Sequence, residues 1–576
     1  MCLFLPFLVH MGSLKAPFFY DDIAKIVQNP DIRSLDNSTS NFIFTYRDKQ
    51  RNFSQNDPSR PMTYLSFALN YHFNKYDPFG YHLVNILLHC MNTLIIFILL
   101  NTISRLMIHE VPIFFPISAA MFFGVHPVTT SAVSYVFSRS DLLSTLFALS
   151  SFLFFSRSIH GSKWYYFGSL FSFIISIFSK QITVVLPLLL LLMDFFLISE
   201  GKIELMKKRI HFHIPFWCVV IAYLGFRLLY LGGLGDLEAK ELINQRAYII
   251  TQPYVILQYI KLLIFPVGLS VDHLIDASRS IVEFRVVIPA LIIISIGILI
   301  AWIVNQEEKA SYTHHYGSIV AFFALWFFIC LIPTSSIFPT SSLMVDNRMY
   351  FAGIGFCGIL GISYQGLFTS NVIVGTFFKR KLLPLLMLIH LGILAFLTLQ
   401  RNKVYASPEL IWKDVLVQYP KNYRAHYNLG SLYYEKGEYE KAKPHFESTI
   451  LNNPKHSKAL NNLALIHFIQ NDIEKAESLL QASIRLNPNF KEAYLNLGSI
   501  HKKNNSFLKA EACYKRSVEI DPKYSIAWTE LGALYFRLGR WAESEHSLNK
   551  ALEIDPGNMK ASDTISRLKI RQKHVR

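Results

Sequence analysis

The chain has 576 residues, which is too long for a single compact domain. Hydrophobic residues make up 52% and charged residues only 17%, whereas soluble proteins carry about 25% charged residues, so a wholly soluble protein is excluded. The net charge of +16 does not indicate a nucleic-acid-binding protein, because much of it lies in short basic clusters between hydrophobic runs, as at 207–209 (KKR) and 379–381 (KRK).

Residues 1–14 (MCLFLPFLVHMGSL) form a short apolar segment at the start of the chain. A spanning helix needs ~20 apolar residues, and this segment also lacks the basic start and the cleavage site of a signal peptide. We interpret it as the end of a truncated first transmembrane helix. A short interfacial anchor is the alternative.

Two adjacent acids, Asp21 and Asp22, follow in the segment 15–32 (KAPFFYDDIAKIVQNPDI), before the first long hydrophobic run. A carboxylate at a membrane boundary becomes partly desolvated as a site closes over it, which raises its pKa and suits it to act as a general base. The competing interpretation is an acid pair that caps the following helix at 23–29. The residues alone leave both open.

Ten hydrophobic runs that are long enough, or nearly long enough, to span a membrane come next. They are 82–104, 112–134, 142–159, 163–180, 181–199, 211–231, 282–304, 317–334, 347–368 and 382–399. With the truncated first helix, they predict an all-α, multi-pass membrane domain of about eleven helices over residues 1–400.

Lysine and arginine in short loops belong on the cytoplasmic side of a membrane. We assign the basic clusters to the cytoplasmic side and let the chain cross the membrane at each run. The loops on the outer side are then a long first loop, 15–81, and the loops 135–141, 232–281 and 335–346. The segment 250–268 is apolar but contains polar residues and prolines, and we interpret it as an amphipathic helix lying in the interface. The acid pair and the C-terminal part of the chain then share the outer side.

Charged residues and histidines recur in the segments around that outer side. The set comprises Arg60, His82, His89, His126, Arg139, Asp141, Lys180, Asp346 and Arg348. Each alone has an ordinary explanation, since charges at helix ends extend to the interface. Together they suit a substrate with a negatively charged phosphate and a lipid tail. No spacing of His or Cys marks a metal site, and the six cysteines are far apart.

The C-terminal part repeats with a period of 34 residues, which is typical of tetratricopeptide repeats. Prolines recur at this spacing, as do leucines and small residues; the registers include Pro420, Pro454, Pro488, Pro522 and Pro556, and Gly430, Ala464, Gly498 and Gly532. This predicts an α-solenoid with a connecting half repeat at 401–422, four full repeats at 423–558, and a capping helix with a basic tail at 559–576. Such a stack presents a concave face suited to an extended peptide.

Several phrases of the chain resemble the transmembrane and tetratricopeptide repeat-containing O-mannosyltransferases and their bacterial relatives, which are GT-C glycosyltransferases. The phrases are FFYDDIAKIVQNPDI, SRPMTYLSFALNY, YHLVNILLH, HPVTTSAVSYVFSRSDLL, SKQITVVLPL and DNRMYFAGIGF. They run through residues 17–357 in family order, before the repeats. Two positions depart from the family pattern: Ser138 stands where Gly is frequent, and Asp346 stands where Glu is expected.

The resemblance implies an inverting transferase that moves a sugar, such as mannose, from a polyprenyl- or dolichyl-phosphate donor to a Ser or Thr hydroxyl outside the cytoplasm. Asp21 or Asp22 would deprotonate the acceptor, and Arg139, Lys180 and Arg348 would bind the donor phosphate. Arg60, His82, His89, His126, Asp141 and Asp346 are possible substrate contacts. The acid pair could hold a divalent metal, but no ligand set is evident. The repeats would gather the acceptor protein.

Two other classes of function stay open at this level. One is a membrane-anchored repeat scaffold without catalysis, and the other is a lipid-linked sugar transporter or polymer ligase. A transporter would place its acids in the middle of a helix, whereas these lie at an edge. Composition favours a bacterial inner membrane with periplasmic repeats; an endoplasmic reticulum membrane with lumenal repeats is the alternative.

Overall fold

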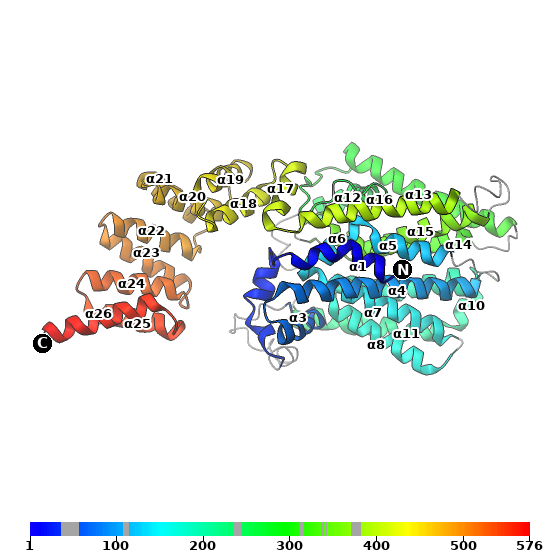
Figure 1. The fold of residues 1–576 in the computed structure, drawn as a ribbon, viewed down its shortest axis with the longest axis horizontal. Coiled ribbons are helices and arrows are strands. Elements are labelled where there is room, and N and C mark those ends of the chain that lie inside the picture. Colours follow the sequence, from blue (N-terminus) through cyan, green and yellow to red (C-terminus); the bar gives the residue numbers. More distant parts are fainter. Residues whose placement is uncertain are drawn as a thin grey trace. The chain divides into compact units, whose positions relative to one another are not determined.

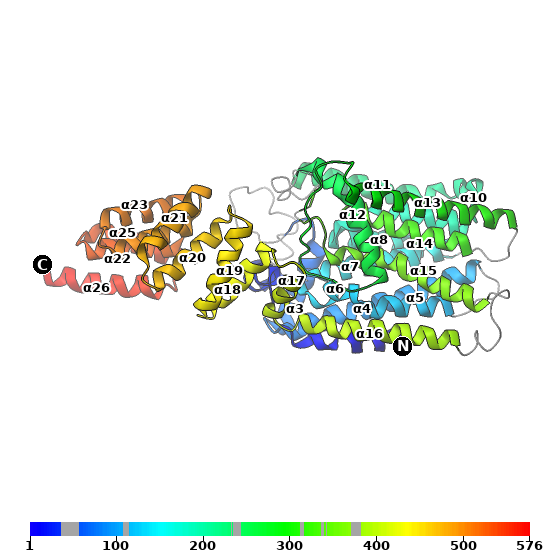
Figure 2. The ribbon, with the colours of Figure 1, turned by 90° about the horizontal axis from the view of Figure 1, so that it is seen from above.

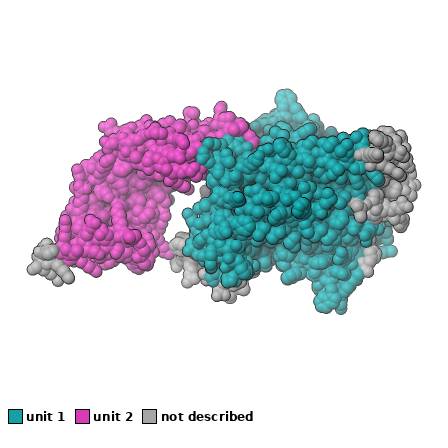
Figure 3. All heavy atoms as spheres, in the orientation of Figure 1, with its two compact units in different colours: residues 1–414 teal, residues 415–576 magenta. Residues whose placement is uncertain are grey.

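The computed structural model describes residues 1–35, 57–107, 114–159, 161–231, 233, 244–310, 316–335, 339–340, 342–369 and 382–575. The chain divides into two compact units, Met1–Asp414 and Val415–Arg576 (Figure 3). Both units are helical, and no strand occurs among the residues described. The all-α class predicted from the sequence is confirmed. The basic cluster at 379–381 lies outside the described residues.

The first unit is a bundle of helices (Figures 1 and 2). Its helices are α1 (Phe4–His10), α3 (Pro61–Asn74), α4 (Pro78–Met107), α5 (Phe114–Val125), α6 (Thr130–Ser134), α7 (Arg139–Ser158), α8 (Lys163–Ser179), α9 (Leu186–Met193), α10 (Ile203–Lys208), α11 (Ile210–Phe226), α12 (Gln245–Ile264), α13 (Phe284–Ala310), α14 (Tyr316–Leu331), α15 (Met349–Thr369) and α16 (Leu383–Val404). Short helical turns connect several of them, including η2 (Ile23–Val27), η6 (Val136–Ser138), η7 (Gln181–Val185), η8 (Asp194–Ile198) and η11 (Asp346–Arg348). In both views α3 lies at one end of the bundle and α10 at the other.

Seven helical stretches among the described residues are long and apolar enough to cross a membrane. They are Pro78–Arg105, Gln181–Ile198, Ile210–Leu231, Gln245–Ile264, Phe284–Gln306, Asp346–Phe368 and Leu383–Val404. The stretch Gln245–Ile264 covers most of the segment interpreted as an interfacial helix, so its length and composition also permit a crossing. The interfacial placement stays a prediction.

Two predicted runs differ from simple spanning helices. The run 112–134 is broken after α5, where Pro127 follows His126 and begins a short turn, because proline cannot continue the preceding helix. The run 142–159 lies within α7, which is rich in buried serines. Hydroxyls bond α7 to α8: the Ser151 Oγ donates to the Ser169 carbonyl at 2.9 Å, and the Ser169 Oγ donates back at 2.7 Å. A helix enclosed by other helices needs no apolar surface toward lipid.

The second unit is a stack of helix pairs. Its helices are α18 (Tyr423–Glu435), α19 (Tyr439–Asn452), α20 (Ser457–Ile469), α21 (Ile473–Leu486), α22 (Lys491–Lys503), α23 (Phe507–Ile520), α24 (Ser525–Arg537), α25 (Trp541–Ile554) and α26 (Met559–Val575). The helix α17 (Pro408–Gln418) precedes them. Small residues permit close packing within each pair, since a Cβ at Gly498 would lie 2.6 Å from the Tyr514 ring. The chain forms tetratricopeptide repeats, as predicted.

Candidate active site at the acid pair

The acid pair lies on a tight turn that follows α1. Tyr20 has a φ of 54°, which is uncommon for a residue with a side chain. The turn closes through two backbone hydrogen bonds, from the Asp22 N–H to the Phe19 carbonyl at 3.0 Å and from the Ile23 N–H to the Tyr20 carbonyl at 3.2 Å. The turn separates the two carboxylates and gives them different surroundings.

Asp22 is fully buried, and both of its oxygens accept backbone hydrogen bonds. The Phe137 N–H donates to Oδ1 at 2.8 Å, and the Phe19 N–H donates to Oδ2 at 3.3 Å. Burial raises the pKa of Asp22 well above its usual value, against the lowering effect of these hydrogen bonds. Asp22 therefore joins the acid turn to the segment before α7 and is not exposed to a substrate.

Asp21 is partly exposed and makes a different contact. The Tyr135 hydroxyl donates to Asp21 Oδ2 at 2.8 Å, and the Asp21 N–H donates to the same hydroxyl at 3.2 Å. Burial raises the pKa of Asp21, while Tyr135, Lys25 and Arg60 lower it to a smaller extent. Oδ1 accepts no hydrogen bond from the described part of the chain, so this oxygen is open to a proton donor.

A buried ion pair links the start of α7 to the residue that follows α8. The Lys180 ammonium contacts both oxygens of Asp141 at 2.7 Å, and this pair is largely buried. The Thr63 hydroxyl donates to the Ser179 carbonyl at 3.0 Å, which holds the start of α3 against the end of α8. Arg60, at the N-cap of α3, consequently interacts electrostatically with both Lys180 and Asp21.

Arg60 itself pairs with a carboxylate on the preceding loop. Its Nε lies 3.2 Å from Asp57 Oδ2, and the Arg60 side chain is 21% exposed. The Ser59 backbone and hydroxyl also donate to Asp57. Although burial alone raises the pKa of Asp57, Arg60 and Ser59 hold it below its usual value. Arg60, which pairs with Asp57, thus interacts with both Asp21 and Lys180, and Lys180 itself pairs with Asp141.

Arg139 is fully buried and bonded inside the protein. Its guanidinium donates to Asn85 Oδ1 at 2.8 Å, the Ser66 carbonyl at 3.2 Å, Asn70 Oδ1 at 2.8 Å and the Tyr81 carbonyl at 2.9 Å. These contacts join α7 to α3 and α4. A phosphate would have to displace several of them, so the geometry favours a supporting role over the predicted phosphate contact.

Arg348 is also bonded to groups within the protein. Its guanidinium donates to the carbonyls of Leu343 at 3.1 Å and Ser342 at 2.8 Å, and to the Thr340 hydroxyl at 2.7 Å. It holds the chain before α15 rather than facing Asp21. The neighbouring Asn347, which the sequence analysis did not select, donates to Asp141 Oδ2 at 3.2 Å and therefore reaches the Lys180 pair.

The remaining predicted contacts are buried and bonded within the bundle. Their partners are the Ala16 carbonyl for His82 (3.0 Å), the Tyr350 hydroxyl for His89 (2.8 Å), the Leu263 carbonyl for His126 (2.9 Å), and both His273 Nε2 (2.7 Å) and the Ser270 N–H (2.8 Å) for Asp346. These contacts join distant helices and loops. None of these side chains contacts Asp21 in the described structure.

One short segment, 135–141 (YVFSRSD), organises the site, and we refer to it as the anchor segment. Tyr135 contacts Asp21, the Phe137 N–H contacts Asp22, and Asp141 holds Lys180. Sequence reasoning selected Arg139 and Asp141 here and missed Tyr135. A tyrosine in an apolar chain carries no distinguishing spacing, and its partner lies 114 residues away.

The described residues contain no group of three or more His, Cys, Asp or Glu side chains placed to hold a metal ion. Within the acid pair, both oxygens of Asp22 already accept backbone N–H groups. The donor set is therefore unlike a divalent-metal site, which needs several oxygen ligands.

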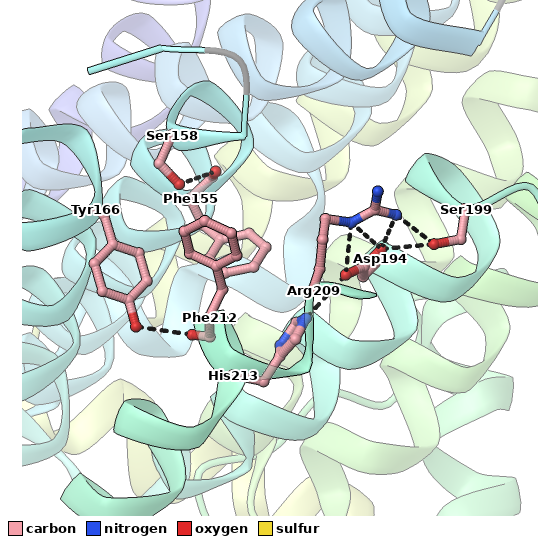
Figure 4. A network of polar contacts seen from close by, with 8 residues as sticks. All are labelled: Phe155, Ser158, Tyr166, Asp194, Ser199, Arg209, Phe212 and His213. Atoms are coloured by element: carbon pink, nitrogen blue, oxygen red, sulfur yellow. Dashed lines mark hydrogen bonds and ion pairs between the residues drawn. The ribbon is translucent and has the colours of Figure 1, made fainter. Parts of the chain in front are cut away.

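A second buried acid cluster lies near α10, at the end of the bundle opposite α3 (Figures 1, 2 and 4). Asp194 accepts from the Arg209 guanidinium at 2.7 Å and from the Ser199 hydroxyl at 2.8 Å, and its Oδ2 lies 3.0 Å from His213 Nε2. Ser199 and His213 both contact the carboxylate, so the histidine does not lie between the serine and the acid. The cluster therefore lacks the relay of a hydrolase triad.

Comparison with known proteins matches both parts of the chain. Tetratricopeptide repeat models match residues 411–442, 427–489, 491–524 and 525–558. The protein O-mannosyl-transferase F38B6.6 of Caenorhabditis elegans is 26% identical over 460 residues, covering 77% of this chain and 61% of the relative. Human protein O-mannosyl-transferase TMTC4 is 26% identical, with coverages of 74% and 62%. Drosophila melanogaster protein O-mannosyl-transferase Tmtc3 is 22% identical, with coverages of 77% and 53%.

These relatives confirm the resemblance inferred from the sequence phrases. The chain spans about three fifths of the length of the curated relatives it matches. Together with the seven candidate membrane helices, the similarity identifies a multi-pass membrane protein that carries tetratricopeptide repeats.

Proposed function

We propose that this protein is a membrane glycosyltransferase that transfers a sugar, mannose by analogy with its relatives, from a polyprenyl- or dolichyl-phosphate donor to Ser or Thr hydroxyls of proteins. The proposal depends mainly on Asp21, an acid with one open oxygen on which the positive charges of Lys25 and Arg60 act. The similarity to O-mannosyl-transferases supports the same reaction class.

Asp21 is the proposed base, and Asp22 is the residue that holds it in place. A base must be reached by its substrate, and Asp22 is fully buried, with each of its oxygens already accepting a backbone N–H. Asp21 has a neutral partner and a raised pKa, which increases its basicity once it is ionised. This assignment separates two acids that the sequence alone could not distinguish.

The proposed reaction is a single displacement. The acceptor Oγ–H proton moves to Asp21 Oδ1, the oxygen attacks the anomeric carbon, and the bond between that carbon and the phosphate oxygen breaks. The lipid phosphate leaves with the electron pair. Attack from the face opposite the phosphate inverts the anomeric configuration.

Lys180 and Arg60 are the proposed contacts of the leaving phosphate. Arg60 interacts electrostatically with Asp21 and with Lys180, and a positioned cation stabilises the charge that develops on the leaving oxygen. Asp141 holds the Lys180 ammonium in place between turnovers. Arg139 and Arg348 would support the site by bonding the surrounding segments.

The repeats are the proposed acceptor-binding part, placed on the same outer side of the membrane as Asp21. Amide side chains link α20 and α22, the first helices of two neighbouring repeats. The Asn496 Nδ2 donates to Asn461 Oδ1 at 2.8 Å, and the Asn461 Nδ2 donates to Asn462 Oδ1 at 3.1 Å. Such amides can exchange partners with the backbone of an extended peptide.

The test compares Asp21→Asn with Asp31→Asn in the full-length protein, reconstituted with polyprenyl-phosphate mannose and a peptide rich in Ser and Thr. Asp31 lies in the same segment, and among the described residues its Oδ2 accepts no hydrogen bond, so it controls for the chemical change. We expect Asp21→Asn to lower transfer by about 10²–10⁴-fold and Asp31→Asn to leave it unchanged. Mass spectrometry of the peptide measures the added hexose.

Full transfer by Asp21→Asn would refute the catalytic assignment. Absence of transfer by the unmodified protein, together with normal cellular function of Asp21→Asn, would favour the scaffold. Transport of a lipid-linked sugar across vesicles without transfer to peptide would favour the transporter.

A further inference from the structure

We infer that Tyr135 is a positioning residue for the proposed base: its hydroxyl holds Asp21 Oδ2 and thereby turns Oδ1 toward the acceptor. The inference rests on the proposed function of Asp21. It concerns a residue that acts through Asp21 and does not itself exchange a proton with the substrate.

The two hydrogen bonds between Tyr135 and Asp21 form a closed contact. The Tyr135 hydroxyl donates to the side-chain Oδ2 at 2.8 Å and accepts from the Asp21 N–H at 3.2 Å. One hydroxyl therefore fixes both the backbone and the carboxylate of the same residue. Rotation of the carboxylate would break the shorter bond, so Oδ1 keeps one direction.

Tyr135 is itself held in place by the surrounding bundle. Its ring packs against Phe19 with the ring centres 4.9 Å apart. The Asn85 amide donates to the carbonyls of Val133 at 3.3 Å and Tyr135 at 3.5 Å, and the Asn85 Oδ1 accepts from Arg139. The buried Arg139 therefore supports the anchor segment that carries Tyr135.

A neutral donor suits this position better than a cation does. A hydrogen bond to the ionised carboxylate stabilises it without removing most of its basicity, whereas a salt bridge lowers the pKa of an acid by about 1–3 units. The site contains such a salt bridge a few residues away, between Asp141 and Lys180. Tyr135 gives Asp21 a fixed orientation without an ion-pair partner.

Other titratable groups around Asp21 also shape its pH dependence. They are Asp22 and Tyr20 on the acid turn, Lys25 on η2, Arg60 at the N-cap of α3, and Tyr64 on α3. Lys25 and Arg60 lower the pKa of Asp21, as does the Tyr135 hydrogen bond. Loss of the Tyr135 hydroxyl alone leaves the other groups in place, and the pKa of Asp21 should rise.

The experiment measures the pH profile of kcat/KM for Tyr135→Phe in the same reconstituted transfer assay. A base is active when ionised, so its activity falls as pH drops through its pKa. We expect the acidic limb to move to higher pH, and kcat/KM at its plateau to fall about tenfold to a hundredfold. The KM for the lipid donor should stay the same.

Tyr166→Phe is the matched control. The Tyr166 hydroxyl, on α8, donates to the Phe212 carbonyl of α11 at 2.9 Å (Figure 4). The Tyr166→Phe variant loses a comparable hydrogen bond, and its acidic limb should lie at the same pH as in the unmodified protein. A Tyr135→Phe variant with an unmoved acidic limb, at any plateau rate, would overturn the inference.

Two additional measurements keep the inference testable if Tyr135→Phe misfolds or if no transfer is found. Replacement of Tyr135 by 3-fluorotyrosine keeps the shape and makes the hydroxyl a stronger donor, so the limb should move to lower pH; an unmoved limb would count against the inference. Labelling of protonated Asp21 by a carbodiimide, followed by mass spectrometry, reports its titration without any transfer. The midpoint should rise in Tyr135→Phe, and an unchanged midpoint would overturn the positioning role alone, not the proposed function.

Discussion

Asp21 and Asp194 lie in acid clusters at opposite ends of one helix bundle, and their partners differ in charge. Asp194 is fully buried and contacts an arginine, a histidine and a serine, with both oxygens used (Figure 4). Asp21 is partly exposed, contacts the neutral Tyr135 hydroxyl, and keeps one oxygen open. A carboxylate paired with a cation holds structure together, whereas a carboxylate oriented by a neutral donor keeps the basicity that proton transfer requires.

The Asp194 cluster joins three consecutive elements. Asp194 begins η8, Arg209 immediately precedes α11, and His213 lies in the first turn of α11. The Arg209 Nε also approaches both carboxylate oxygens, at 3.2 and 3.3 Å. The helix α10 lies between these residues in the chain, so the cluster ties η8 to the start of α11.

The largest expected effect is on stability, from Asp194→Ala. Removal of the carboxylate leaves Arg209 without its buried partner, which costs about 3–5 kcal/mol. We expect a large loss of folded protein extracted from membranes and a lower unfolding temperature. Asp31→Asn, outside any such cluster, should behave like the unmodified protein. Normal stability of Asp194→Ala would show that the cluster does not hold the helices, and the contrast with Asp21 would lose its basis.

The next effect comes from giving Asp21 a charged partner. Tyr135→Lys places an ammonium where the phenol lies and makes the site resemble the Asp194 cluster. An ion pair lowers the basicity of Asp21 by about 1–3 pKa units, so we expect transfer at neutral pH to fall by more than about 100-fold, further than in Tyr135→Phe. Rates equal to those of Tyr135→Phe would indicate that the charge of the partner is unimportant.

The sequence predicts most of the helical architecture, but it does not predict the different roles of Asp21 and Asp22. The hydrophobic runs and the 34-residue period predict the helices and the repeats because both are local patterns. The separate roles of Asp21 and Asp22 depend on Tyr135 and the Phe137 N–H, which lie 114 and 115 residues away. Contacts at that distance are set by packing and leave no local signal.

The predicted cations illustrate the same limit. Arg139, Lys180 and Arg348 are equivalent as charges near helix ends in the sequence. In the structure, Arg139 and Arg348 bond to backbone carbonyls and neutral side chains, whereas Lys180 pairs with Asp141. A cation can reach a substrate only if few internal acceptors already bind it. The sequence does not show how many such acceptors surround each cation.

A smaller effect is expected from Lys180→Gln. Loss of the ammonium should raise the KM for the lipid-phosphate donor about tenfold to a hundredfold, because one charge-assisted contact is worth about 1.5–3 kcal/mol, and Lys180→Arg should retain most of the affinity. The double variant Asp141→Asn/Lys180→Gln separates two explanations. Donor binding by Lys180 predicts that the double variant stays impaired; recovery would mean that Lys180 serves only to neutralise Asp141.

The smallest effect is expected in the repeats, where close packing of side chains, rather than a buried ion pair, holds the helices together. A Cβ at Gly498 would lie 2.6 Å from the Tyr514 ring, so Gly498→Ala should destabilise the repeats by about 1–3 kcal/mol. The second repeat already has Ala464 at this register, and its facing residue is Leu480. Tyr514→Leu should therefore restore part of the loss in the double variant.

Denaturant unfolding of the repeats measures the stability of both variants. Gly557→Ala is the control, because a Cβ at Gly557 meets only an ordinary contact at 3.4 Å. Additive losses in the double variant would mean that the ring does not set the size limit at position 498.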